Sequence, residues 1–314
     1  MDQLRAMRVF ARVIDAGGFA RAAQGLDIAP AVATRLVADL EEHLGARLIN
    51  RTTRRLALTD VGETYLERVR GILTEVDDAA ALASLATAEP RGRLSVLSPP
   101  GFTVHQLAKL LPRFRAQYPH VSIELTVSDV EAPGENHDVT IIVQRRKPID
   151  GNFIARRLAT AEVVLCATPE YLDEHGRPKH PDDLAGHDTL MPIAPTGRRE
   201  LHFEPALGTG PSVMVELKKT PSLATAHVDT LYAAALAGIG ITGLPSFIAE
   251  DALMEQALER VLPQWHMQTV TLFAAMPTRK HVPMRTRAFV DFLVATFGQN
   301  QRDPWLASAG CESC

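Results

Sequence analysis

The sequence predicts an α+β protein with a helical N-terminal region, one long helix and a larger α/β region. Three observations predict this architecture. Short amphipathic segments occupy residues 1–45, an apolar repeat with alternating spacings of 4 and 3 runs through residues 60–90, and strand-like and helix-like segments alternate from Arg93 onward. A chain of 314 residues is long enough for about two domains, and 46% hydrophobic with 22% charged residues is a globular composition.

The composition also excludes several classes of protein. No run of about 18 apolar residues could span a membrane, and charged residues interrupt any N-terminal signal peptide. The three cysteines, Cys166, Cys311 and Cys314, cannot form a disulfide framework, so we expect a reducing, cytoplasmic location. Because the net charge is −4, any nucleic-acid site must be local.

The first 45 residues are predicted to form three helices. The first ends near Ala16, the second covers residues 19–26, and the third begins at Pro30 and stops at Gly45. An apolar stripe predicts the core side of the third helix at Val32, Leu36, Leu40 and Leu44. The arrangement is either a helix-turn-helix, whose third helix enters a DNA major groove, or an ordinary three-helix packing unit.

Residues 47–58 are expected to form two short extended runs around Thr52-Thr53, which suits a wing beside a helix-turn-helix. Residues 45–58 contain no acid but four arginines, namely Arg47, Arg51, Arg54 and Arg55. An acid-free cluster of this kind is typical of a surface that contacts phosphates or a groove, and it also fits a solvated loop.

A long helix is predicted after Thr59 or Asp60, either of which can cap it. Its apolar positions follow the a and d positions of a coiled coil, with the seam at Tyr65, Val69, Ile72, Val76, Ala79 and Ala83. The seam predicts dimerisation; the alternative is an amphipathic helix packed on its own domain. Residues 89–92 break the helix and predict a domain boundary.

From Arg93 onward the pattern is that of an α/β region. Strands are predicted at residues 94–97, 121–127, 139–143, 163–167, 213–217, 239–241 and 270–275, and helices at 103–118, 223–237, 247–258 and 284–297. These elements could form one large sheet or two lobes with a cleft. Ligands of such folds bind beyond the carboxyl ends of the strands.

No motif in the chain predicts an enzyme, a metal or a cofactor. Residues 238–243 fit G-x-G-x-x-G, but they follow a helix instead of a strand, so a dinucleotide site is not expected. The chain has neither H-E-x-x-H nor a nucleophile elbow. Cys311 and Cys314 form a C-x-x-C without a second pair, in a segment, residues 301–314, that is expected to be a flexible tail.

Several short motifs resemble those of LysR-type transcriptional regulators. The N-terminal signature lies at residues 19–23, 40–41, 44–45, 51–54 and 58–62. Further likeness lies at residues 114–119, 169–172, 183–187, 237–240 and 244–245, so the resemblance spans almost the whole chain.

This resemblance implies a DNA-binding transcriptional regulator with three parts. These are a winged helix-turn-helix domain (1–59), a dimerising linker helix (60–90) and an effector-binding domain (91–300). The last is expected to have two α/β lobes like those of periplasmic binding proteins, lobe I at 91–161 and 269–297 and lobe II at 162–268. The implied partners are double-stranded promoter DNA, a small-molecule effector and RNA polymerase, and the implied assembly is a homodimer or homotetramer. The alternative is a small-molecule-binding or enzymatic α/β domain fused to a DNA-binding module.

The residues expected to contact DNA are Arg21, Pro30, Ala31, Thr34, Arg35, Arg51, Thr53, Arg54 and Arg55. Two departures from the family pattern affect this set. Gly18 replaces a usual serine, so the second helix loses a side-chain cap. Pro30 and Ala31 replace usual polar residues, which shifts DNA readout toward Thr34, Arg35, the wing and DNA shape.

The effector is expected to contact Pro100, Gly101, Phe102, Thr103, Ser128, Gln144, Thr196, His202, Thr225 and Thr242. A helix that begins near Pro100 could hold an anionic group at its N-terminus, so an organic anion is one candidate effector. After the third strand the family often has an arginine, and the matching stretch here is Ile142-Val143-Gln144; a tryptophan common in the family is replaced by Leu201-His202. These departures predict that the site has its own ligand specificity.

Overall fold

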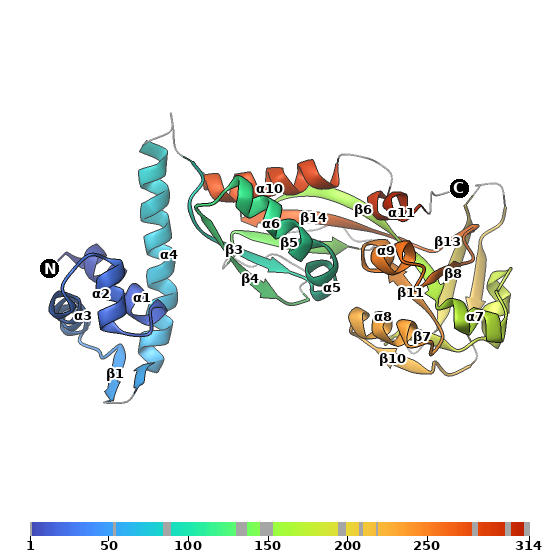
Figure 1. Ribbon diagram of the computed structural model, residues 1–314, viewed down its shortest axis with the longest axis horizontal. Helices are drawn as coiled ribbons and strands as arrows, with labels where there is room; N and C mark the ends of the chain where they lie inside the picture. Colours follow the sequence, from blue (N-terminus) through green and yellow to red (C-terminus); the bar gives the residue numbers. More distant parts are fainter. Residues whose placement is uncertain are drawn as a thin grey trace. The chain divides into compact units, whose positions relative to one another are not determined.

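The computed structural model describes residues 2–52, 55–83, 89–129, 137–144, 153–193, 199–206, 210–217, 219–277, 282–298 and 303–310. The chain divides into two compact units, unit 1 at Met1–Ala88 and unit 2 at Glu89–Cys314 (Figure 1). Unit 1 consists of helices and one hairpin, whereas unit 2 is built on a large sheet, so the prediction of an α+β protein is confirmed.

Unit 1 has the order of elements of a winged helix-turn-helix followed by a long helix. Its elements are α1 (Gln3–Asp15), α2 (Phe19–Gly25), α3 (Pro30–Leu44), β1 (Ile49–Thr52), β2 (Arg55–Leu58) and α4 (Asp60–Ala83). Pro30 takes the first turn of α3, and Gly45 ends it with a φ of +65°, so both predicted ends of this helix are confirmed. Gly18 precedes α2 without a side-chain cap.

The core side of α3 differs from the predicted stripe. Ala33, Val37 and Leu40 are buried, whereas Val32 is 40% exposed. The prediction for Val32 was therefore wrong, because the small side chain of Ala33 takes the core position next to it. Leu36 is only partly buried against the same core.

Helix α4 packs its apolar side on its own unit. Val69 is fully buried in the core of unit 1, and the ring of Tyr65 lies 6.0 Å from the ring of Phe10. For Val69 the alternative of packing within the domain is therefore correct, whereas Tyr65 is only partly buried against this core. Ile72 is 43% exposed and Val76 is half-buried. The side chains of Ala79 and Ala83 lie outside the described residues.

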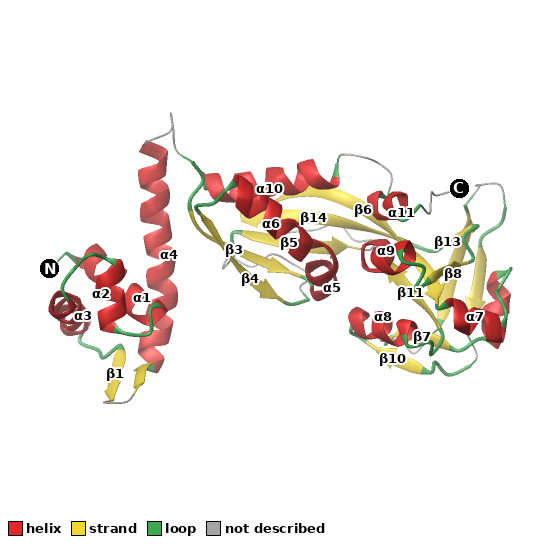
Figure 2. Cartoon of the chain, in the orientation of Figure 1, coloured by secondary structure: helices red, strands yellow, loops and turns green. Residues whose placement is uncertain are grey.

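Unit 2 is built on one mixed sheet of nine strands in the order β10-β7-β11-β6-β14-β5-β3-β4, with β12 paired to β6 (Figure 2). The strands are β3 (Gly92–Ser98), β4 (Val121–Val127), β5 (Val139–Gln144), β6 (Phe153–Ala167), β7 (Thr189–Pro192), β10 (Leu223–Thr225), β11 (Ile241–Pro245), β12 (Glu259–Val261) and β14 (Thr269–Pro277). Strands β4, β3 and β5 are parallel, as are β10, β7 and β11. Between these groups β6 and β14 run antiparallel to each other.

Strand β6 changes partners in its middle. It pairs with β14 up to Glu162 and with β11 from Val163 on. We use this change to define lobe I as residues 89–162 and 269–298, and lobe II as residues 163–268. The sheet is continuous, and the two lobes have different cores, although the core of lobe I also includes Phe247 and Ile248 of lobe II. The two alternatives of one sheet and two lobes are thus both present in one structure.

In lobe I, α5 (Pro100–Phe102), the π-helical turn η1 (Thr103–Leu107) and α6 (Ala108–Gln117) follow one another without a break. Helix α10 (Met284–Phe297) packs beside α6, because Phe114 contacts both Phe289 and Phe292 (Figure 1). Lobe II contains α7 (Pro169–His175), the 3-10 helix η2 (Pro181–Gly186), α8 (Val228–Leu236), α9 (Ser246–Met254) and a small sheet of β8 (Glu200–Pro205), β9 (Val213–Glu216) and β13 (Trp265–His266).

Several predicted elements of lobe II need correction. The helix predicted at 223–237 begins at Val228, because residues 223–225 pair with β7 as β10. The strand predicted at 239–241 is β11, at 241–245, which the backbone of Gly240 approaches so closely that a Cβ there would lie 2.4 Å from the Asp188 carbonyl oxygen. Strands β7, β8, β12 and β13 were not predicted.

The predicted flexible tail is wrong for residues 303–310. They form α11 (Pro304–Ser308), in which Trp305 is 3% and Leu306 is 1% exposed. The carboxylate of Asp303 caps this helix by accepting hydrogen bonds from the backbone of both residues. Cys311 and Cys314 lie outside the described residues.

Candidate DNA interface and effector site

The N-terminal half of α3 presents a mostly apolar surface with one guanidinium. Pro30 and Ala31 are exposed, and the side chain of Arg35 is 84% exposed. Its Nε lies 4.0 Å from a carboxylate oxygen of Asp39, one turn further along. Thr34 is half-buried, and its hydroxyl donates to the carbonyl of Pro30 at 3.0 Å. Thus Arg35 is the long polar side chain that this part of α3 extends outward.

Two further arginines expected at the interface lie on other elements. Arg21 is exposed on α2 and donates from Nη2 to the carbonyl of Gly17 at 3.0 Å. Arg51 lies on β1 opposite Leu56 of β2, and Arg55 pairs with Thr52 in the same hairpin. Thr53 and Arg54, expected at the tip of the wing, lie outside the described residues.

The hairpin is fixed to α3 by Glu41, a residue to which the sequence analysis gave no role. A carboxylate oxygen of Glu41 accepts hydrogen bonds from the backbone N–H groups of Leu48 (2.8 Å) and Ile49 (3.0 Å). Both residues are fully buried, so water cannot easily replace the carboxylate. The sequence signal for this role was an acidic residue in the C-terminal half of α3, shortly before the wing.

The other end of the hairpin is fixed by the start of α4. The hydroxyl of Thr59 donates to the carbonyl of Arg47 at 2.7 Å and accepts from the N–H of Gly62 at 2.9 Å. Gly62 is needed because a Cβ there would lie 2.0 Å from the carbonyl oxygen of Leu48. Glu41, Thr59 and Gly62 therefore hold the wing beside the recognition helix.

In unit 2, three polar residues lie at the carboxyl ends of neighbouring parallel strands. Ser98 ends β3, Ser128 follows β4, and Gln144 ends β5. The N–H of Ser128 donates to the carbonyl of Ser98 at 3.1 Å, so two of them are adjacent. The hydroxyl of Ser98 is buried without a hydrogen-bond partner. Ser98 was missed in the sequence, although its place at the end of an apolar strand is the usual position for a ligand contact.

The helix that follows Ser98 starts in contact with lobe II. A Cβ on Gly101 would lie 2.7 Å from Ile248 and 3.1 Å from Val228, both of lobe II. Pro100 is half-buried, and the buried hydroxyl of Thr103 donates to the carbonyl of Pro99 at 2.8 Å. The lobes therefore touch where the sequence predicted an open cleft.

Two of the expected effector contacts are core residues in this arrangement. Phe102 is fully buried and packs against the rings of Phe247 and Phe297. Thr242 is 1% exposed, and its hydroxyl donates to the carbonyl of Leu190 at 3.0 Å. Neither side chain is open to a ligand here, because sequence position alone does not show toward which side of a strand or helix a residue points.

The remaining expected contacts are spread over lobe II. Thr225 is half-buried, and its hydroxyl accepts from the N–H of His227 at 3.1 Å. His202 is exposed on β8, in the separate three-stranded sheet. Thr196 lies outside the described residues. The structure thus places Ser128 beside Ser98. Gln144 lies beyond the pairing of β5 with β3 and opposite Thr271 of β14, and His202 lies in a different sheet.

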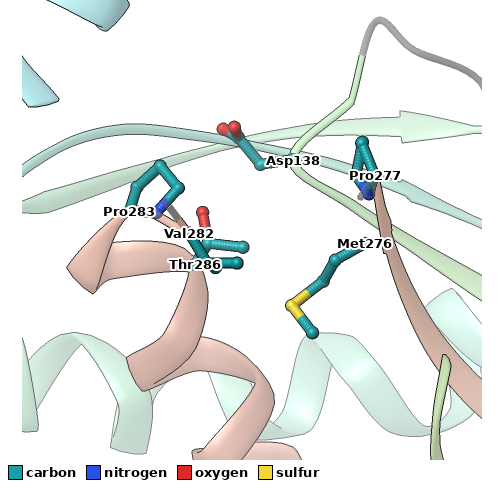
Figure 3. A pocket seen from close by; sticks show the side chains of 6 residues that line it. All are labelled: Asp138, Met276, Pro277, Val282, Pro283 and Thr286. Carbon is teal, nitrogen blue, oxygen red and sulfur yellow. The ribbon is translucent and has the colours of Figure 1, made fainter. Parts of the chain in front are cut away.

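Lobe I contains a cavity beside the start of α10 that cannot hold an effector (Figure 3). Its volume is about 10 Å³, which is room for one water molecule. The residues around it are Asp138, Met276, Pro277, Val282, Pro283 and Thr286. The hydroxyl of Thr286 is buried without a protein partner, so a single water is the ligand that this cavity fits.

The part of the chain that the structure describes contains neither a membrane-spanning helix nor a metal-ligand cluster. No helix among them has the length and apolarity to cross a membrane. Within the same residues, no three His, Cys, Asp or Glu side chains are grouped as metal ligands would be.

Comparison with known families agrees with this architecture. Residues 4–63 match the bacterial regulatory helix-turn-helix proteins of the lysR family, and residues 87–298 match the LysR substrate binding domain. The chain belongs to the LysR family of DNA-binding transcriptional regulators. Regulators of this type bind DNA and small-molecule effectors and act as oligomers.

Individual relatives are similar over almost their full length. The HTH-type transcriptional regulator CrgA of Neisseria meningitidis serogroup B is 34% identical over 296 residues, which is 94% of this chain and 97% of that protein. The HTH-type transcriptional repressor PA14_22550 of Pseudomonas aeruginosa is 33% identical over 300 residues, covering 96% and 94%. A solved structure of CrgA from Neisseria meningitidis matches with a TM-score of 0.58 at 32% identity, covering 94% of this chain and 99% of that one.

Proposed function

We propose that this regulator reads its operator with the exposed N-terminal half of α3 and contacts the DNA backbone with the wing. The observation that carries the proposal is the exposed surface of Pro30, Ala31 and Arg35, held beside the hairpin by Glu41. Arg35 supplies a cation for a phosphate or a guanine, and the side chain of Ala31 suits contact with a thymine methyl group. Arg51, Arg54 and Arg55 would add phosphate or minor-groove contacts from the wing, and Arg21 and Thr53 would support them.

The test is a salt titration of the full chain on a duplex selected from random sequence by the protein itself. Arg35→Ala should weaken binding and lower the slope of log affinity against log salt by roughly one. Arg115→Ala is the matched control, since it removes the same charge from an exposed position on α6. Equal losses for the two variants would refute the assignment of α3.

We further propose that a small organic effector binds at the carboxyl ends of β3, β4 and β5. The buried hydroxyl of Ser98, which lacks a hydrogen-bond partner, supports this place, and Ser128 and Gln144 lie at the ends of the two neighbouring strands. Binding there would require the contact between Gly101 and lobe II to open or shift.

The effector proposal is tested by screening small organic acids for a rise in melting temperature. A ligand at one hundred times its Kd stabilises the folded state by about 2.7 kcal/mol. Ser98→Ala and Gln144→Ala should each reduce that rise, whereas Ser122→Ala, at an exposed position earlier in β4, should not. A ligand that stabilises all three variants as it does the parent binds elsewhere.

The assembly is proposed to be a homodimer through α4, extended to a homotetramer through unit 2. Ile72, exposed on α4, supports the first contact. RNA polymerase is a further proposed partner, and the proposed place of action is the cytoplasm. We propose that the chain acts as a regulator and not as an enzyme, which the names of the relatives above, all transcriptional regulators, support.

A further inference from the structure

The last described segment of the chain is anchored at the junction of the two lobes. One carboxylate oxygen of Asp303 accepts from the N–H of Glu162 at 2.6 Å and from the hydroxyl of Ser246 at 2.7 Å. Glu162 is the last residue of β6 in lobe I, and Ser246 is the first residue of α9 in lobe II. Asp303 therefore binds both lobes through one atom.

The other carboxylate oxygen of Asp303 holds α11 in place. It accepts from the N–H groups of Trp305 at 3.0 Å and Leu306 at 3.1 Å. Burial raises the pKa of this carboxyl group above its usual value. The four hydrogen bonds that it accepts act in the opposite direction and stabilise its ionised form. A buried acid with such a set of partners indicates a specific anchor.

The two apolar residues of α11 enter different cores. Trp305 packs against Phe297 in the core of lobe I, to which Phe247 of lobe II also contributes, whereas Leu306 is buried in a core of lobe II. The next polar residue continues the connection, because the hydroxyl of Ser308 donates to the carboxylate of Glu250 on α9. Short as it is, α11 thus contacts both lobes.

Glu250 also binds the helix of lobe I that touches lobe II. Its second carboxylate oxygen accepts from the side-chain amide of Gln106 at 2.8 Å. On either side of Gln106, His105 lies 3.1 Å from Asp229, and Lys109 lies 2.6 Å from Asp251. All three lobe I residues lie in or next to the π-helical turn η1, a geometry frequent at functional positions.

We propose that α11 is a strap that fixes the angle between the two lobes, with Asp303 as its anchor. The lobes are otherwise joined by β6, β14, the polar contacts of residues 105–109 and the apolar contacts of Gly101 and Phe102 with α9. Releasing the strap frees β6 at Glu162 and removes Trp305 from the lobe I core, so the lobes gain freedom to turn about the β6–β14 pair. In an effector-responsive regulator, this makes the C-terminal segment a control element for the arrangement that the effector selects.

Asp303→Asn separates the anchor from the helix cap. Asparagine caps helices about as well as aspartate, so its amide oxygen can still accept from Trp305 and Leu306. The amide NH₂ then faces the N–H of Glu162, and two donors cannot bond to each other. The matched control is Asp291→Asn, which makes the same change at an exposed position on α10.

Tryptophan fluorescence reports the strap directly. The chain has two tryptophans, and in a Trp265→Phe background Trp305 is the one that remains. Quenching of Trp305 by acrylamide should rise several-fold in Asp303→Asn and stay at the parent value in Asp291→Asn. If Trp305 remains as protected in Asp303→Asn as in the parent, Asp303 is not the anchor.

The angle between the lobes is followed by the distance between spin labels on Ser122→Cys in lobe I and Met254→Cys in lobe II, with Cys311 and Cys314 changed to serine. The distribution of this distance should broaden or shift in Asp303→Asn, and also in a chain shortened to end after residue 302. An unchanged distribution in either released chain overturns the proposal. Loss of the secondary structure of unit 2 in the shortened chain also overturns it, because α11 would then be an integral part of the core.

Discussion

Removal of the Glu41 side chain should detach the wing from the recognition helix. Its carboxylate accepts hydrogen bonds from the backbone N–H of Leu48 at 2.8 Å and of Ile49 at 3.0 Å. Hydrogen bonds to a charged group are worth ~1.5–3 kcal/mol each, so the loss of two in Glu41→Ala should destabilise the hairpin by about 3 kcal/mol. Glu41→Gln keeps an acceptor oxygen and should cost about 1 kcal/mol.

Amide hydrogen exchange of the full chain measures this effect at the hairpin itself. A loss of about 3 kcal/mol corresponds to roughly a hundredfold faster exchange of the wing amides where they open locally. Affinity for a selected duplex should fall as well, although the substitution removes an acid from a DNA-binding surface. A lost negative charge alone would strengthen DNA binding, so the two explanations have opposite signs.

Glu42→Ala is the control, because Glu42 is exposed on the same turn of α3. It should leave the wing amides protected and should not weaken DNA binding. If Glu41→Ala and Glu42→Ala give the same exchange pattern in the wing, the carboxylate is not what holds the hairpin, and the argument fails.

Three further predictions concern the packing of both units. Gly62→Ala should lower the melting temperature, because its Cβ would lie 2.0 Å from the Leu48 carbonyl oxygen and such overpacking costs ~1–3 kcal/mol. Gly71→Ala, whose Cβ meets no atom within 4 Å, should leave the melting temperature unchanged, and an equal decrease in both variants would contradict this explanation. Ile72→Asp should weaken dimerisation, measured by sedimentation, without unfolding unit 1. Val69→Asp should unfold unit 1, since that side chain is fully buried. A Val69→Asp protein that is folded but monomeric would show that Val69 belongs to the dimer seam. Burial raises the pKa of the Cys166 thiol to about 12, so in a chain with Cys311→Ser and Cys314→Ser a thiol reagent should label it only after denaturation, and labelling of the native protein would disprove its burial.

The sequence predicted best where local chemistry determines the structure. Proline in the first turn and glycine after the last turn define both ends of α3, and neither depends on the rest of the fold. Strand β4 and helix α10 also have the predicted ends, residues 121–127 and 284–297, because each is a continuous apolar or amphipathic run between turn residues.

The failures lie where long-range packing decides. The period of residues 65–83 fits a dimer seam and a helix packed on its own unit equally well, and only the fold shows that Val69 contacts the core of unit 1. Strands β7 and β10 are four and three residues long, so their pairing with each other, and not their pattern, defines them. In the candidate effector site, the burial of Thr242 and the unpartnered hydroxyl of Ser98 are likewise results of packing.

Helix α11 has clear start signals in the sequence. Aspartate at 303 and proline at 304 are a helix start, and the tryptophan and leucine that follow are apolar residues with no reason to lie in water. Capping and hydropathy together predict a helix here more strongly than position in the chain predicts a flexible tail.

The antiparallel pairing of β6 with β14 has a consequence for the modularity of unit 2. Glu162 and Thr269 face each other across this ladder, and the N–H of Val163 donates to the carbonyl of Gln268 at 2.8 Å. All of lobe II therefore leaves and re-enters the chain at two adjacent backbone positions, as an insertion into a hairpin does. A two-residue type I′ turn could join those positions and close lobe I upon itself. Lobe II is in this sense an insertion into the chain of lobe I, which enters and leaves it between neighbouring residues of one strand pair.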